Sequence, residues 1–194
     1  MIASRLIGYA LFVSGGLLAT FAGGRYAVGG YRRAEAFRAW NENAARQEVA
    51  LALKDANGPN AALPIVEGAP VARILIPKIR LDEIVLEGVA DDELNAAPGH
   101  YPGSAFPGER GNAIVSAHRD RQFDRLDELV VGDTIRTESG AMNTRWIVTS
   151  RRVVDKNAPA LFRTQDATLT LTTCWPIRYF GPAPQRLIVV AKQG

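Results

Sequence analysis

From Val71 onward, short apolar or alternating segments recur between turn-forming residues, and this pattern limits the possible folds more than any other feature of the chain. We expect a short helix over residues 91–97 and a helical turn over residues 123–129, and the Gly/Pro-rich residues 98–111 are expected to be irregular. Strands are expected near residues 71–79, 82–89, 112–118, 134–137, 144–154, 167–173 and 186–191. Seven or eight short strands in about 124 residues predict a closed or nearly closed β-barrel or a sandwich.

The N-terminal region has a different character. Residues 6–24 form a run of 19 residues without a charge, which reaches the roughly 20 residues that an α-helix needs to cross a bilayer. We interpret residues 1–30 as an uncleaved N-terminal membrane anchor. A cleaved signal peptide and a buried soluble helix are the alternatives.

A stalk is predicted between this anchor and the strand-rich domain at residues 71–194. Residues 31–54 are Ala-rich, with apolar side chains near helical spacing, and they predict a helix. Residues 55–70 contain several Gly and Pro residues, which break regular structure and indicate a linker. Residues 31–70 are therefore expected to form a helical stalk and linker.

Composition excludes some classes of function. The net charge is only +3, whereas a nucleic-acid-binding protein usually shows a larger, clustered basic excess. Cys174 is the single cysteine, so the chain can form neither an intrachain disulfide nor a CxxC-type zinc site. With two histidines, a metal site would depend on carboxylates. We expect no metal, no cofactor and no nucleic-acid partner.

Three residues with catalytic potential stand at predicted strand ends. Cys174 ends a β-branched run and precedes Pro176, His118 ends the strand near residues 112–118, and Arg186 begins the last strand. If these ends are aligned, an imidazole could exchange a proton with the thiol while a guanidinium stabilises an oxyanion. The alternatives are a buried structural cysteine, a surface histidine and a solvated arginine.

These residues resemble the sortase family. Residues 170–174 read TLTTC and match the sortase signature TLxTC, and residues 112–120, NAIVSAHRD, resemble the sortase histidine strand. An alanine, Ala117, replaces the glycine that is frequent before the histidine. Arg186 follows Cys174 by twelve residues, as the sortase arginine does. The surrounding sequence is most similar to class D sortases or the related sortases of Gram-negative bacteria.

The resemblance implies a mainly β fold: an eight-stranded sortase-type β-barrel with short helices, behind a transmembrane helix and a helical stalk. It implies a cysteine transpeptidase that cleaves an LPxTG-like C-terminal sorting signal and passes the acyl group, held as a Cys thioester, to an amine. Carried over, Cys174 is the nucleophile, His118 the general acid/base and Arg186 the substrate-binding and oxyanion group. The active pair is expected to be thiolate and imidazolium.

The resemblance also implies partners and a location. The partners would be a secreted protein with a sorting signal and an amine acceptor, either a cell-wall precursor or a protein. We expect a single-pass protein of the bacterial cell membrane with its catalytic domain on the extracytoplasmic side, although arginines follow the uncharged run. A cysteine endopeptidase that hydrolyses the same signal and a non-catalytic membrane-tethered binding barrel are the alternatives.

Other residues near the three are weaker candidates. Asp120 could orient His118 or cap the following turn. His100 lies in the Gly/Pro-rich segment and is not expected to be catalytic. Residues expected to contact the substrate, or else to fill the sheet or its loop, are Thr172, Thr173, Trp175, Leu161 and Phe162.

Overall fold

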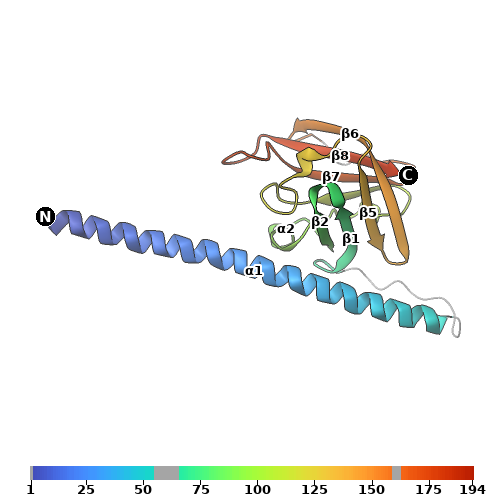
Figure 1. The fold of residues 1–194 in the computed structure, drawn as a ribbon, viewed down its shortest axis with the longest axis horizontal. Helices are drawn as coiled ribbons and strands as arrows, with labels where there is room; N and C mark the ends of the chain where they lie inside the picture. Colours follow the sequence, from blue (N-terminus) through green and yellow to red (C-terminus); the bar gives the residue numbers. More distant parts are fainter. Residues whose placement is uncertain (1, 55–65, 159–162) are drawn as a thin grey trace.

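A computed structural model describes residues 2–54, 66–158 and 163–194 of the chain. It contains a long helix, α1, and a closed β-barrel that lies beside this helix (Figure 1). The elements in chain order are α1 (Ile2–Lys54), β1 (Pro70–Ile76), the 3-10 helix η1 (Pro77–Ile79), β2 (Leu81–Glu87), α2 (Asp91–Ala96), β3 (Gly99–His100), β4 (Asn112–Ser116), the 3-10 helix η2 (Leu126–Glu128), β5 (Thr134–Ser139), β6 (Met142–Asp155), β7 (Thr168–Trp175) and β8 (Gln185–Gln193).

The eight strands close into a barrel in the order β1-β2-β3-β4-β7-β8-β6-β5. This confirms the predicted mainly β fold with eight strands and short helices, and it excludes the sandwich. Most neighbouring strands are antiparallel, but β2 with β3 and β4 with β7 run parallel. The prediction that residues 98–111 are wholly irregular was wrong at Gly99–His100, which forms β3. These two residues form a strand because their backbone pairs with β2 and β4 on either side. The sequence of the segment itself does not indicate this pairing.

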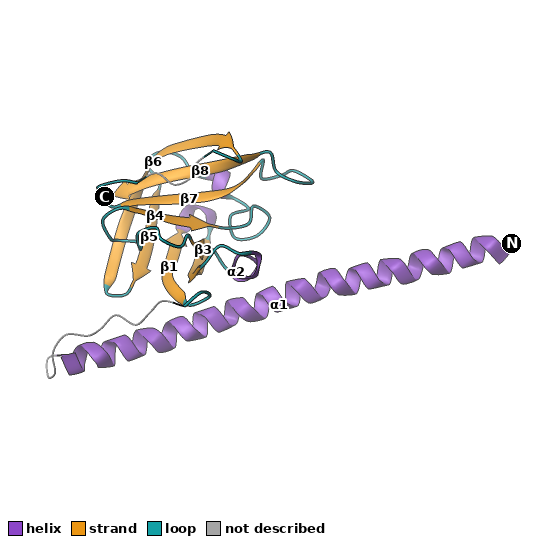
Figure 2. Cartoon of the chain, turned by 180° about the vertical axis from the view of Figure 1, so that it is seen from behind, coloured by secondary structure: helices purple, strands orange, loops and turns teal. Residues whose placement is uncertain are grey.

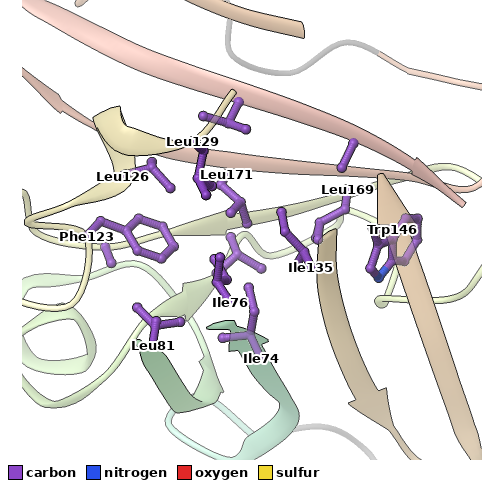
Figure 3. Packing of buried hydrophobic residues seen from close by; sticks show 14 of the residues in the cluster. Ile74, Ile76, Leu81, Phe123, Leu126, Leu129, Ile135, Trp146, Leu169 and Leu171 are labelled. Atoms are coloured by element: carbon purple, nitrogen blue, oxygen red, sulfur yellow. The ribbon is translucent and has the colours of Figure 1, made fainter. Parts of the chain in front are cut away.

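The barrel interior is filled by aliphatic and aromatic side chains from β1, β2 and β4–β8. The predicted helical turn adds Phe123, Leu126 and Leu129, which are completely buried beside Leu171 and Ile76 (Figure 3). Each side chain of this size stabilises the fold by roughly 1.5–3 kcal/mol when it is fully buried. This core gives the barrel a rigid frame on which strand ends can hold functional groups.

Helix α1 is continuous across the boundary that we expected between anchor and stalk at residue 30. Its middle part docks on the barrel near β2 and α2 (Figure 2). There the Arg33 guanidinium lies 2.7 Å from a carboxylate oxygen of Glu83. Burial raises the pKa of Glu83, and the bond from Arg33 opposes part of that rise. The apolar part of the contact consists of Ala36, Phe37, Trp40, Ile84, Leu86, Ala96 and Ala97.

The N-terminal part of α1 lies beyond the barrel and has little protein around it (Figure 1). Large apolar side chains on this part are exposed, among them Leu11, Phe12, Leu17 and Leu18. Within the part of the chain that the structure describes, no helix has the combination of length and hydropathy expected of a membrane span.

Candidate active site

Cys174 and Arg186 are cross-strand partners at one end of the barrel. They lie directly opposite each other in the antiparallel ladder of β7 and β8. Residues paired in this way have Cα atoms about 4.5–5.5 Å apart and side chains on the same face. Both side chains are half-buried. The Arg186 Nε donates a hydrogen bond to the Lys156 carbonyl at 3.3 Å, which holds the guanidinium beside the loop after β6.

His118 reaches the same end of the barrel from β4. Strands β4 and β7 run parallel, and Ser116 lies opposite Thr172. The pairing continues past the end of β4, because the Ala117 N–H donates to the Thr172 carbonyl at 3.2 Å. Two residues further along each chain, this register brings His118 level with Cys174.

The three residues share the outer face of the barrel. Three side chains beside them on the same strands point into the core: Ala117, Leu171 and Leu187. Successive strand side chains alternate between faces, so His118, Cys174 and Arg186 point outward. The barrel therefore presents a thiol with an imidazole on one flanking strand and a guanidinium on the other, all reachable by a ligand that binds from outside.

Of the predicted contact residues on β7, Thr172 alone shares the face of Cys174. Its side chain is 3% exposed, and its hydroxyl has no hydrogen-bond partner among the described residues. Thr173 faces the other way and donates to the Ala117 carbonyl at 2.7 Å, which fastens β7 to the end of β4. Trp175 packs against the core. Thr172 therefore lies buried on the face of Cys174, whereas Thr173 and Trp175 make structural contacts.

Two further predicted contact residues, Leu161 and Phe162, lie outside the described residues. Asp120 is exposed two residues beyond His118, and none of the hydrogen bonds or ion pairs described for the chain involves its carboxylate. The structure thus brings together His118, Cys174 and Arg186, and it does not link Asp120 to them.

Arg119 connects the loop after β4, residues 117–125 (the histidine loop), to the loop between β7 and β8. No role for Arg119 was predicted from the sequence. Its guanidinium donates to the Pro176 carbonyl at 3.1 Å and to the Gly181 carbonyl at 2.7 Å. The same group lies 5.6 Å from the ring centre of Tyr179, a cation–π contact. Arg119 therefore binds the loop that follows the cysteine to the loop that carries the histidine. Its position next to His118 was the available signal, but its partners are 57 and 62 residues away in the sequence.

His100 lies in a separate polar network. It is 1% exposed, and its Nδ1 lies 2.6 Å from a carboxylate oxygen of Glu87. Its Nε2 lies 3.0 Å from the Ala105 carbonyl and 2.9 Å from the Ser104 hydroxyl, and its ring stacks on Phe106. These contacts hold the loop after β3 against the barrel.

The arrangement of the three outward residues suits acyl transfer. A thiolate attacks carbonyl carbon readily, an imidazole can donate and accept a proton, and a guanidinium keeps its positive charge throughout. Arg186 is directly beside Cys174, so its charge is available where a carbonyl under attack would develop an oxyanion.

Comparison with known proteins connects this geometry to one family. The family model described as the sortase domain matches residues 74–194. Sortase D of Bacillus subtilis (strain 168) is 36% identical to the chain over 120 residues, which make up 61% of this chain and 61% of that protein. The match thus spans less than two thirds of that relative's length.

Solved structures show the same likeness. A sortase D5 transpeptidase of Clostridium perfringens superposes with a TM-score of 0.66 and 25% identity, over 84% of this chain and 96% of the other. Sortase C1 of Streptococcus agalactiae superposes with a TM-score of 0.60 and 28% identity, over 70% of this chain and 72% of the other. The catalytic domain of sortase D from Bacillus anthracis superposes with a TM-score of 0.58 and 27% identity, over 71% of this chain and 96% of the other.

Proposed function

Because the chain belongs to the sortase family, we propose that it is a cysteine transpeptidase that cleaves an LPxTG-like sorting signal near the C-terminus of a secreted protein. The acyl part of the signal passes through a thioester on Cys174 to an amine, either a cell-wall precursor or another protein. The observation that supports this most directly is the pairing of Cys174 with Arg186, with His118 level with them on β4. The similarity to sortases D supports class D.

The proposed reaction has two steps. In the first, the Cys174 thiolate attacks the carbonyl carbon of the scissile peptide, and the Arg186 guanidinium stabilises the oxyanion. The protonated His118 gives its proton to the departing amine, so the peptide C–N bond breaks as the thioester forms. In the second step an incoming amine attacks the thioester, His118 takes a proton from it, and Cys174 leaves as the thiolate.

The proposed location is the bacterial cell membrane, with residues 1–30 as the anchor and the barrel on the extracytoplasmic side. The support is the uncharged run of 19 residues and the exposed apolar side chains on that part of α1, such as Phe12 and Leu18. Arg25, Arg32 and Arg33 follow the run and would favour the opposite orientation, but long domains translocate largely regardless of flanking charge.

Intact-protein mass spectrometry of the full chain in detergent tests the activity. The protein is incubated with a mixture of LPxTG-like peptides, with and without a simple amine. We expect a mass increase equal to the N-terminal peptide fragment, located on Cys174 and discharged by the amine into a new amide product. Cys174→Ala, the matched control, should give no adduct.

Two results would contradict the proposal. Peptide release at the same rate and with only hydrolysed product, whatever the amine concentration, would identify an endopeptidase. Absence of any adduct together with a Cys174 that a thiol-alkylating reagent does not modify would identify a non-catalytic binding barrel.

A further inference from the structure

The loop between β7 and β8, residues 176–184, carries two aromatic side chains near its middle that are exposed to solvent. Phe180 is fully exposed, at 103%, and Tyr179 is 49% exposed. Arg178 beside them is also exposed. A single exposed apolar residue is common on protein surfaces. The position of this loop relative to α1 gives the exposed pair a specific meaning.

The base of the loop is held in place. Arg119 binds the carbonyls of Pro176 and Gly181, which lie on either side of the aromatic pair, and stacks near Tyr179. The Phe180 ring is therefore presented by a braced loop, and its full exposure means that packing on the described residues does not explain a phenylalanine there.

The barrel end that carries this loop lies close to the uncharged run of α1. The Arg121 Nη1 donates to the Asn95 carbonyl at 2.8 Å, and a Cβ placed on Gly29 would lie 3.0 Å from each of these two atoms. Helix α1 thus touches the histidine loop at Gly29. Gly29 follows Gly24, the end of the run, by five positions, which is about 8 Å along a helix.

The loop also points toward the part of α1 that is proposed to enter the membrane. Figures 1 and 2 show it projecting from the barrel toward the N-terminal end of α1, away from the β5–β6 hairpin. The docking contacts of α1, including the Arg33–Glu83 pair, hold the helix and the barrel in this relative position. The loop therefore projects along α1 in the direction in which a membrane-inserted run would lie.

From this geometry we propose that Tyr179 and Phe180 insert into the interfacial region of the membrane that holds α1, with Arg178 against anionic lipid headgroups. Aromatic side chains favour this interface, and arginine binds phosphate groups well. The inference rests on the proposed membrane anchoring. Contact at both α1 and the loop holds the Cys174 end of the barrel at a constant height above the lipid.

The first test measures depth at Phe180. In a Cys174→Ala background of the full chain, Phe180→Cys carries an environment-sensitive fluorophore, and the protein is reconstituted into phosphatidylethanolamine–phosphatidylglycerol vesicles. We expect strong quenching by a spin-labelled lipid and protection from aqueous iodide. Met142→Cys lies at the β5–β6 hairpin, which Figure 1 shows on the side of the barrel away from the loop; it is the matched control and should show the reverse.

The two proposals fail in different ways. Vesicle flotation measures the anchor independently of the loop. If the protein floats with the vesicles but iodide quenches the labels at 180 and 142 equally, the loop proposal is overturned and the anchor stands. If the protein does not float, the anchoring is wrong and the loop inference falls with it.

A second test separates lipid contact from substrate contact. Phe180→Ser should lower turnover of a lipid-anchored sorting peptide in vesicles roughly threefold or more, because the loop no longer holds the site at the surface. Turnover of a short soluble peptide in detergent should remain unchanged. An equal loss with both substrates would identify Phe180 as a substrate contact and would overturn the membrane role.

Discussion

Cys174 lies on the middle strand of three, with Arg186 opposite it on β8 and His118 level with it at the end of β4. The thiol thus has a guanidinium opposite it on an antiparallel neighbour and an imidazole level with it at the end of a parallel one. Each relationship depends on a separate strand register, so a shift in either pairing would move one functional group away from the thiol.

Arg186 is expected to be essential for turnover. Arg186→Ala removes the charge opposite Cys174 and should lower kcat/KM by roughly 10²–10³, the usual cost of losing an oxyanion-stabilising donor. Arg186→Lys keeps the charge but loses the planar fork and should recover only part of the activity. Arg136→Ala, an exposed change on β5, is the control. Near-normal kcat/KM in Arg186→Ala would remove Arg186 from the mechanism.

Arg119 is expected to act as a positioning residue. Arg119→Ala breaks the bonds to Pro176 and Gly181, so hydrogen exchange of the loop amides at residues 176–184 should accelerate. Misplacement of the adjacent site should lower kcat roughly tenfold to a hundredfold. Asp124→Ala, an exposed change in the histidine loop, serves as the control. Slow exchange together with lost activity would show that Arg119 acts in the chemistry and not through the loop.

Thr172 gives a test that separates stability from catalysis. Its buried hydroxyl has no partner among the described residues, which costs about 1–3 kcal/mol relative to a bonded one. We expect Thr172→Val to raise the free energy of unfolding by about 1 kcal/mol and to lower transpeptidation, because the substrate then loses a hydrogen-bonding group.

Thr172→Ser, which keeps the hydroxyl, should retain most of the activity. Two outcomes contradict this prediction. Unchanged turnover in the valine variant would mean that the substrate does not use the hydroxyl, and a lower melting temperature would mean that the hydroxyl is bonded in the free protein.

The Arg33–Glu83 pair predicts a pH-dependent loss of stability. Burial raises the pKa of Glu83 in the folded state, and Arg33→Ala removes the group that opposes this rise. A carboxyl with a raised folded pKa prefers to stay protonated in the fold. The variant should therefore match the parent near pH 4 and lose stability as the pH rises toward 7, by about 1 kcal/mol for a partly exposed pair.

Thermal unfolding of the full chain in detergent at the two pH values measures this effect. Arg38→Ala, on an exposed part of α1, is the control. Adding Glu83→Gln to Arg33→Ala should abolish the extra loss of stability between pH 4 and pH 7. An equal loss at pH 4 and pH 7 would show that Arg33 contributes through packing and not through the charge of Glu83.

Much of the barrel could be predicted because its strands carry local signals. Alternation and turn residues located every strand except β3, and the spacing of Phe123, Leu126 and Leu129 indicated the buried turn. Strand β3 was missed because two residues contain no periodicity, and Gly99–His100 is a strand only through its neighbours. Helix α1 runs through residue 30, the predicted boundary between anchor and stalk, because a change in composition does not by itself end a helix.

The sequence by itself determined which chemical groups the site contains. Cys174, His118 and Arg186 were identified from motif and position at strand ends, because these signals are local. Only the tertiary structure decided that they share the outer face, that Thr172 joins them while Thr173 points away, and that Arg119 reaches the loop after Cys174. The reason is physical: register, barrel closure and loop contacts are set by packing between segments far apart in the chain, which no local pattern encodes.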